Sequence, residues 1–365
     1  MSTGSAAKSR FLDAGLFDPT SAPEPEQPIF EGLLYRGDLA VHIGREKHRK
    51  SNLTLQKAIC AALGRPFLHF KHGTGQPMRV VILDYESKNT SFHKRYEAIC
   101  RAIGLSEEER TNLRVYIQVL LVRELRKKCI PLPRFPVRIQ SKQEQEAESW
   151  WRQFAKEYPA DIYIFDPMRC LHVQDENDST IEALLSKMRD IFPNAAMIVP
   201  HHMNRSSANM RDGGGSPITL SQPESLRMFA NGARGSTAIN AHADVVVCQE
   251  RKVEGDVETV YLGAYMKDSA DVEPLPLVES DQESFYWIVS RKVPERLRAS
   301  YEALRRAAQP FKSAADAVTV LMAGQNGHGA ARATAYRHVK DLRNGGFLVL
   351  DADGNLAVGE CSSEI

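Results

Sequence analysis

The chain has 365 residues, enough for one large domain and one small one. Its 47 Lys and Arg nearly balance 46 Asp and Glu, which excludes a polycation, so any nucleic-acid surface must be local. Six scattered cysteines without a CxxC pair argue against a disulfide framework or a zinc site. The N-terminus lacks a hydrophobic signal core, and no apolar run reaches the roughly 20 residues that span a bilayer. We therefore expect a soluble, cytoplasmic protein without a membrane partner.

Residues 1–28 are rich in proline, acidic and small residues, which predicts a mobile arm. Short apolar runs then alternate with helical patterns, as in a mostly parallel sheet that is covered on both faces. The predicted strands lie at 39–44, 79–86, 112–122, 161–166 and 195–202, and helices are predicted at 52–63, 93–104, around Trp150 and Trp151, and at 180–192. Closely spaced later strands at 243–251 and 258–267, followed by 284–290, predict an antiparallel edge. The expected fold class is α/β.

The composition changes near residue 291. From Arg291 to Leu350 there are 11 Lys and Arg against 4 Asp and Glu, a surplus of 7. A charged helix is followed by two more helical patterns and then by two short strands around Asp353-Gly354, a good hairpin turn. This order predicts a small C-terminal winged helix-turn-helix. The expected division is an arm at 1–28, an α/β domain at 29–290, a helical linker at 291–312 and the winged helix at 313–360.

The stretch "VHIGREKHRKS" (41–51) has the layout of a phosphate-binding loop: an apolar strand, a glycine, four residues, then Lys-Ser and a helix. Such a loop needs glycine so that backbone N–H groups wrap an anion, a lysine for the outer phosphates and a hydroxyl for magnesium. The second glycine of the pattern is replaced by Arg49. A basic surface turn is the alternative interpretation. The residues predicted to bind a nucleotide are Gly44, Lys47, His48, Arg49, Lys50, Ser51 and Asn52.

Three further strands end in residues that fit this interpretation. Asp166 ends an apolar strand, where an acid would orient the magnesium shell. Glu86 follows another strand and could activate a water, although a solvated acid at a strand end is the alternative. His201 and His202 end a third strand, where an imidazole could sense the γ-phosphate. A metal site made from both histidines is disfavoured, because neighbours on a strand point to opposite faces.

The order of these motifs resembles the RecA-like fold and, within it, the RepA-like hexameric replicative helicase ATPases, which are grouped as the AAA_25 domain. The resemblance covers residues 30–290 and rests on the loop at 44–51, "LDYE" with Arg95, "IFDPMRCL", "VPHHMNR" and "ARGSTAINAHADVVV". It implies ATP and Mg²⁺ as cofactors. Lys50 and Ser51 would bind phosphates and magnesium, and Asp166 would bind magnesium. Glu86 would act as the catalytic base, His202 as the γ-phosphate sensor, and Arg234 as an arginine finger for a neighbouring subunit's nucleotide. Two departures bear on the rate: Arg49, and Ser269, which stands where related ATPases carry a second cation after Lys267. Lys267 is still expected near a phosphate.

The resemblance also implies a homo-oligomeric ring that acts on DNA. The family's rings are hexamers, but the residues themselves give no subunit count. The polar, glycine-rich stretch after His202 would face single-stranded DNA in the channel through Arg205 and Arg211, with a surface loop as the alternative. In the predicted winged helix, Arg337, Lys340 and Arg343 could contact duplex DNA, with protein docking as the alternative.

The sequence thus predicts a RecA-like, DNA-dependent ATPase, of which a replicative helicase is one form. Two other functions stay open. One is a nucleotide-gated DNA-binding regulator with little turnover, which Arg49 and Ser269 favour. The other is a defence or signalling ATPase whose winged helix docks a protein partner.

Overall fold

A computed structural model describes the chain over most of its length, in ranges that are separated by short gaps. The described residues are 26–137, 141–172, 178–203, 218–220, 225–233, 235–254, 257–280, 284–289, 295–307, 310–323, 331–344, 348–350 and 356–358. Among them no helix is long and apolar enough to cross a membrane.

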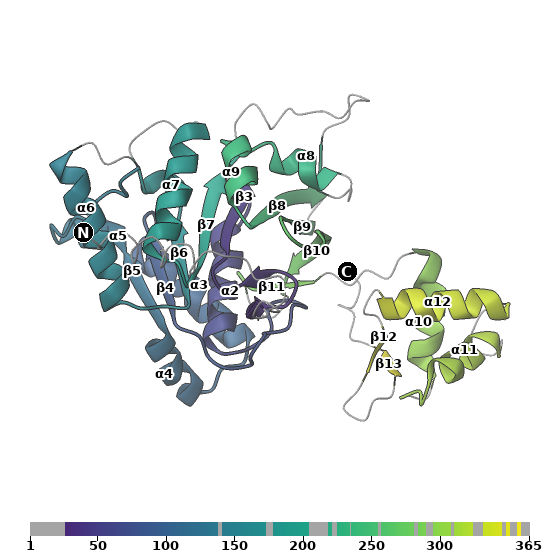
Figure 1. Cartoon of the computed structure of the whole chain (residues 1–365). Helices are drawn as coiled ribbons and strands as arrows, with labels where there is room; N and C mark the ends of the chain where they lie inside the picture. Colours follow the sequence, from purple (N-terminus) through teal and green to yellow (C-terminus); the bar gives the residue numbers. More distant parts are fainter. Residues whose placement is uncertain are drawn as a thin grey trace, which may run out of the picture.

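The centre of the molecule is a nine-stranded sheet in the order β11-β10-β9-β8-β3-β7-β6-β4-β5 (Figure 1). The six strands from β8 to β5 run parallel, whereas β9, β10 and β11 extend the sheet antiparallel. This confirms the predicted α/β class and its antiparallel edge. The strands are β3 (Leu39–Gly44), β4 (Val80–Asp84), β5 (Ile117–Leu121), β6 (Ile162–Asp166), β7 (Ala196–His202), β8 (Val245–Glu254), β9 (Val257–Met266), β10 (Val272–Glu279) and β11 (Trp287–Val289).

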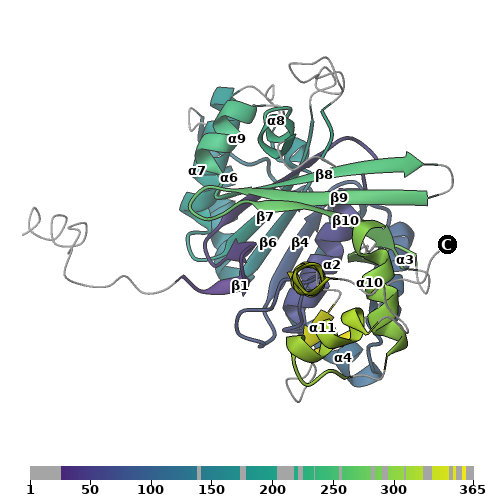
Figure 2. The same cartoon turned by 90° about the vertical axis from the view of Figure 1, so that its right-hand side faces the viewer.

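Helices cover both faces of the sheet (Figure 2). On β3 the side chains alternate between two cores: Leu39, Val41 and Ile43 join one, and Ala40 joins the other. The first core takes in helices α6 to α9 and the second takes in α2, α3 and α4. The helices are α2 (Lys50–Ala62), α3 (Asn89–Ala102), α4 (Glu107–Tyr116), α5 (Val122–Lys127), α6 (Lys142–Glu157), the 3-10 turn η1 (Met168–Cys170), α7 (Asp178–Ile191), α8 (Leu226–Ala230) and α9 (Ser236–His242).

Some local predictions were wrong. Residues 112–116 are helical, not extended, because Ser106 and Glu109 form a capping box that starts α4 and Leu113 packs in the core. The strand begins only at Ile117. Strand β10 was not predicted, since Pro274 and Pro276 argue against a strand; its register shifts between Val272 and Leu275, which accommodates a proline. The small hairpin of β1 (Pro28–Phe30) and β2 (Leu34–Tyr35) was missed as well.

The C-terminal segment has a hydrophobic core of its own. Its elements are α10 (Glu295–Arg306), α11 (Ala314–Met322), α12 (Arg332–Asn344) and an antiparallel pair of strands, β12 (Leu348–Leu350) and β13 (Leu356–Val358). Three helices followed by a two-stranded ribbon agree with the predicted order of elements. The predicted turn at 353–354 lies outside the described residues. The winged-helix assignment and the domain boundaries stay predictions.

Candidate nucleotide-binding site

Several of the polar residues singled out in the sequence meet at one edge of the sheet. Strands β3, β4, β6 and β7 run parallel, so their carboxyl ends lie side by side. In this register Gly44 is opposite His202, and Asp84 is opposite Asp166. The carboxyl edge of an open parallel sheet is where such folds bind ligands.

The loop between β3 and α2 has the tight geometry of a phosphate-binding loop. A Cβ atom on Gly44 would lie 2.7 Å from the Gln249 carbonyl oxygen, so only glycine fits there. Helix α2 begins directly at Lys50, and its N-cap, Arg49, has left-handed backbone with φ 66° and ψ 18°. Lys47 is left-handed too, with φ 63°. The loop thus places backbone N–H groups at a helix N-terminus, where an anion is favoured.

Lys50 lies folded back on its own loop. Its Nζ donates to the carbonyl oxygens of Gly44 at 2.8 Å and Arg45 at 2.9 Å, and lies 3.5 Å from His202 Nδ1. Burial lowers the pKa of Lys50 to about 8, although the carboxylates of Asp166 and Glu86 oppose this shift. The ammonium is therefore mostly charged at neutral pH and lies where outer phosphates would meet it.

The two histidines of β7 point to opposite sides, as predicted. His201 is buried, whereas His202 is half-buried and faces Lys50. Within the described part of the chain, no group of three or more His, Cys, Asp or Glu side chains is placed to hold a metal ion.

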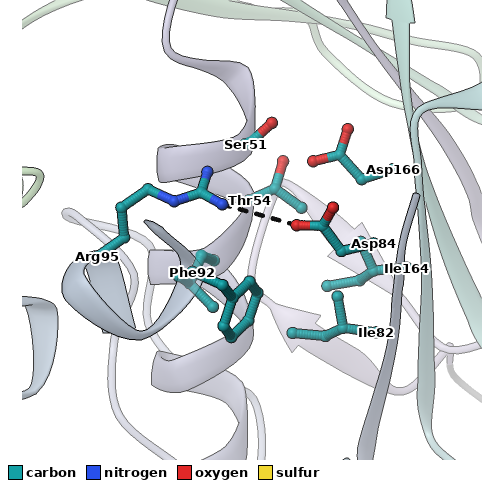
Figure 3. Close-up of a pocket in the computed structure, with 9 residues that line it drawn as sticks. Ser51, Thr54, Ile82, Asp84, Phe92, Arg95, Ile164 and Asp166 are labelled. Carbon is teal, nitrogen blue, oxygen red and sulfur yellow. Dashed lines mark ion pairs between the residues drawn. The ribbon is translucent and has the colours of Figure 1, made fainter. Parts of the chain in front are cut away.

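Two carboxylates, Asp84 and Asp166, lie side by side below the loop (Figure 3). Burial raises the pKa of Asp166 to about 6, with the charge of Asp84 adding to the shift and a hydrogen bond from Ser51 opposing it. Asp84 forms an ion pair with Arg95 of α3 at 3.6 Å. Its Oδ1 also accepts the backbone N–H groups of Glu86 at 3.0 Å and of Ser87 at 2.7 Å.

Asp84 was missed in the sequence analysis, although a signal was present. It is an acid at the end of an apolar strand, two residues before Glu86, and strand ends of this kind were the reason for choosing Asp166. The structure shows that Asp84 closes the turn from which Glu86 projects. Arg95 braces the same turn, since its Nη2 donates to Ser87 Oγ at 2.6 Å.

Most of these side chains, although not Asp84, line one open cavity of about 560 Å³. Of the predicted site residues, 47–52, Glu86, Asp166 and His202 line the cavity, whereas Gly44 is not among the lining residues. Arg95, which was named only as part of the family resemblance, also lines the cavity, as do Arg251 and Phe285. The sequence analysis assigned none of the three a role in the site. The full lining is Glu46, Lys47, His48, Arg49, Lys50, Ser51, Asn52, Glu86, Arg95, Asp166, Pro167, His202, Arg251 and Phe285.

Lys267 is not among the residues that line the cavity of its own chain. Its predicted approach to a phosphate stays a prediction. Strand β9 runs antiparallel to β8, and its last residue, Met266, pairs with Val245 at the start of β8. Lys267 therefore lies at the amino edge of the parallel strands, opposite the loop, and its Nζ donates to the Ala241 carbonyl oxygen. Arg234, the predicted finger, and Arg205 and Arg211, the predicted channel residues, lie outside the described residues.

On α12, the predicted duplex-DNA contacts Arg337 and Lys340 are exposed. His338 faces α10 instead, where its Nδ1 lies 2.8 Å from Ser300 Oγ. Arg343 belongs to α12, but its side chain lies outside the described residues. DNA binding by this helix stays a prediction.

A glycine-anchored loop from β3 to α2, with acids ending β4 and β6 of a mostly parallel sheet, defines a RecA-like P-loop ATPase core. The model of the AAA_25 family, described as an AAA domain, matches residues 6–208. That is more than half of the chain. The chain belongs to the AAA_25 family.

Several solved structures are similar at low identity. The flagellar accessory protein FlaH from Methanocaldococcus jannaschii is 13% identical with a TM-score of 0.43, over 70% of this chain and 89% of that one. The KaiC-like protein PH0186 from Pyrococcus horikoshii OT3 is 12% identical with a TM-score of 0.42, over 72% and 93%. A third structure, described as an ATPase domain, is 13% identical with a TM-score of 0.44, over 69% and 84%. These likenesses are too distant to assign an activity. Among curated proteins no significant match was found.

Proposed function

We propose that this protein binds and hydrolyses ATP with Mg²⁺, and that it does so as an oligomer acting on DNA. The observation that carries the first part is the shared cavity: Lys50, Ser51, Glu86, Asp166 and His202, from four separate elements, line it together. Each residue type has a use in phosphoryl transfer, and the fold brings them to the edge where ligands of such sheets bind.

In this proposal the loop holds the phosphates. The ammonium of Lys50 now binds the carbonyl oxygens of Gly44 and Arg45, and the outer phosphates would replace these neutral acceptors with charged ones. His202, 3.5 Å from Lys50 Nζ, would report on the same phosphate. The left-handed residues Lys47 and Arg49 turn the loop so that its N–H groups can face an anion.

The donors present fit magnesium, which prefers oxygen ligands and keeps several waters. Ser51 and Asp166 would hold it, and Asp84 lies next to Asp166. When bound, magnesium neutralises charge on the β- and γ-phosphates. Such a cation is commonly held by one or two protein groups together with the substrate phosphates, so it would arrive with the nucleotide.

Glu86 is the base in this proposal. It is exposed to the cavity and directed by the turn that Asp84 closes, so its carboxylate can accept a proton from a water held opposite the γ-phosphate. The resulting hydroxide would bond to the γ-phosphorus as the bond to the β–γ bridging oxygen breaks and ADP leaves, while Lys50 balances the charge that develops on the phosphate oxygens.

The DNA part of the proposal is supported by the exposed cations of α12 and by the surplus of 7 positive charges from Arg291 to Leu350. Within the proposal, a ring would pass single-stranded DNA through its channel, with Arg205 and Arg211 at the wall and Arg234 reaching a neighbour's nucleotide. Helicase action is the most specific form of this proposal.

A nucleotide-gated switch with little turnover is the second candidate. It is favoured by Arg49, whose left-handed backbone is unusual for a residue with a side chain. The intact Glu86 and Asp166 favour the hydrolase.

The test is steady-state ATP turnover of the full chain with Mg²⁺, measured alone, with poly(dT) and with duplex DNA. Lys50→Ala is the blank, and Lys71→Ala, which removes an exposed lysine away from the loop, is the matched control. DNA-stimulated turnover that Lys50→Ala abolishes and Lys71→Ala retains is the expected result. ATP binding without turnover above the blank would support the switch, and turnover indifferent to both DNAs would contradict the DNA part.

A further inference from the structure

The loop that follows Gly44 lacks the second glycine expected of its class, and its backbone shows where that matters. Arg49 has φ 66° and Lys47 has φ 63°, both in the left-handed region. Residues with a Cβ atom rarely adopt this conformation, and they keep it only where the surroundings hold it. A contact from outside the loop must therefore stabilise the left-handed backbone, which glycine would adopt without such support.

That contact comes from strand β9. Glu258 accepts two hydrogen bonds from the guanidinium of Arg49, from Nε at 3.1 Å and from Nη2 at 3.5 Å. The carboxylate is well covered, with its side chain 19% exposed. A two-point contact between a planar fork and a carboxylate fixes direction as well as distance.

Strand β8 holds the carboxylate and the loop together. The Arg251 guanidinium donates to Glu258 Oε2 at 2.7 Å, and the Arg251 backbone N–H donates to His48 Nδ1 at 3.1 Å. The Gln249 amide donates to the His48 carbonyl oxygen. Burial alone would raise the pKa of Glu258, but the bonds from Arg251 and Arg49 outweigh it and hold this pKa below its usual value.

We infer that Glu258 is a positioning residue for the nucleotide loop: it clamps Arg49 in left-handed backbone and thereby replaces the missing glycine. This inference rests on the proposed function, in that the loop is the ATP-binding element. It makes the β8–β9 ribbon a support of the nucleotide site, although none of its residues was predicted to act there. Glu258 acts through Arg49 and is not itself a contact of the phosphates.

A double-mutant cycle separates a clamp from a general structural role. Glu258→Gln removes the negative charge that binds Arg49. Arg49→Gly places glycine at the second glycine position of the loop, so that no clamp is needed. The third variant combines both substitutions. Glu273→Gln, an exposed acid on the neighbouring strand β10, is the matched control. Thermal unfolding followed by circular dichroism confirms that each variant is folded.

The first readout is hydrogen–deuterium exchange of the peptide that spans residues 42–52, without nucleotide. Glu258→Gln should speed exchange there about tenfold, the loss expected for one charge-assisted contact. The same change in the Arg49→Gly background should have little effect, and Glu273→Gln none. Equal acceleration in both backgrounds, or none in either, would overturn the clamp.

The second readout is affinity for a fluorescent ATP analogue with Mg²⁺. Glu258→Gln should weaken binding, and Arg49→Gly should recover most of the loss. A loss of the same factor in both backgrounds would contradict the inference. Because exchange needs no nucleotide, a wild-type chain that binds no analogue would contradict the proposed function, while the exchange data would still decide for or against the clamp.

Discussion

Asp84 offers the sharpest test of how the site is built, because its side chain both closes the turn before α3 and forms an ion pair with Arg95. Its Oδ1 accepts the N–H groups of Glu86 and Ser87, which shapes the turn that carries the proposed base. The carboxylate also pairs with Arg95 at 3.6 Å. Asp84→Asn keeps an acceptor for the turn and removes the charge, whereas Asp84→Ala removes both.

The expected magnitudes follow from burial. The Asp84 side chain is 6% exposed and that of Arg95 is 15% exposed. Removing one partner of a buried ion pair, with nothing in its place, costs about 3–5 kcal/mol. We expect Asp84→Ala to lower the free energy of unfolding by that amount. For Asp84→Asn, which keeps the acceptor, about 1–3 kcal/mol is expected.

The effect on catalysis should separate from the effect on binding. A displacement of Glu86 by about 1 Å would lower kcat on the order of 100-fold. Lys50 and the loop are untouched, so affinity for ATP should stay close to that of the wild type.

Urea unfolding gives the free energies, and steady-state turnover with nucleotide titration gives kcat and affinity. Asp268→Asn, an exposed acid beyond the end of β9, is the control. Wild-type kcat in a folded Asp84→Ala variant would refute the argument that this turn aims Glu86.

Three further predictions concern charge. The pKa of Asp166 is raised to about 6 from an ordinary 3.8, so its contribution to stability is present below about pH 4 and is lost as the pH rises through 6. Only the ionised carboxylate holds a cation. Titration with Mg²⁺ should therefore show that the affinity for Mg²⁺ falls below about pH 6. An affinity that does not change between pH 5 and 8 would exclude this carboxylate as a ligand. The pKa of Lys50 is lowered to about 8, so its contribution to stability is present above about pH 10.5 and is lost as the pH falls through 8. ATP binding needs the charged ammonium, so the affinity for ATP should decline above about pH 8. An affinity that stays constant up to pH 10 would contradict a role for Lys50 in binding phosphate. In the C-terminal segment, Arg337→Gln and Lys340→Gln should each weaken binding to duplex DNA and reduce the slope of log affinity against log salt by about 1. An unchanged slope would point instead to protein docking.

Much of the site was predictable from the sequence because its signals are local. Gly44, Lys50 and Ser51 are spaced along the chain as a helix N-terminus requires, and apolar runs ending at Asp166 and His202 mark the ends of strands. In a parallel sheet these ends must share an edge, so their convergence follows from the fold class. The opposite directions of His201 and His202 follow from strand geometry alone.

Other features depended on contacts between residues distant in sequence. Lys267 lies at the sheet edge opposite the loop because β9 runs antiparallel. The direction in which a strand enters a sheet is decided by its pairing partners rather than by its own residues. Residues 112–116 alternate as a strand would, yet the cap at Ser106 made them helical.

The sequence by itself determined the class of site, its loop and the acids at its strand ends, since each is carried by a short pattern. Only the tertiary structure decided what holds them. Arg49 appears in the sequence as a departure from the pattern, and in the fold as one side of a contact with Glu258, 209 residues away. Likewise, Asp84 acquires its role only when β4 lies beside β6 and α3 brings Arg95 to it. Such a contact leaves no signal in either local sequence. The unfavourable left-handed backbone lies at Arg49, and the carboxylate that stabilises it lies on a distant strand, at Glu258.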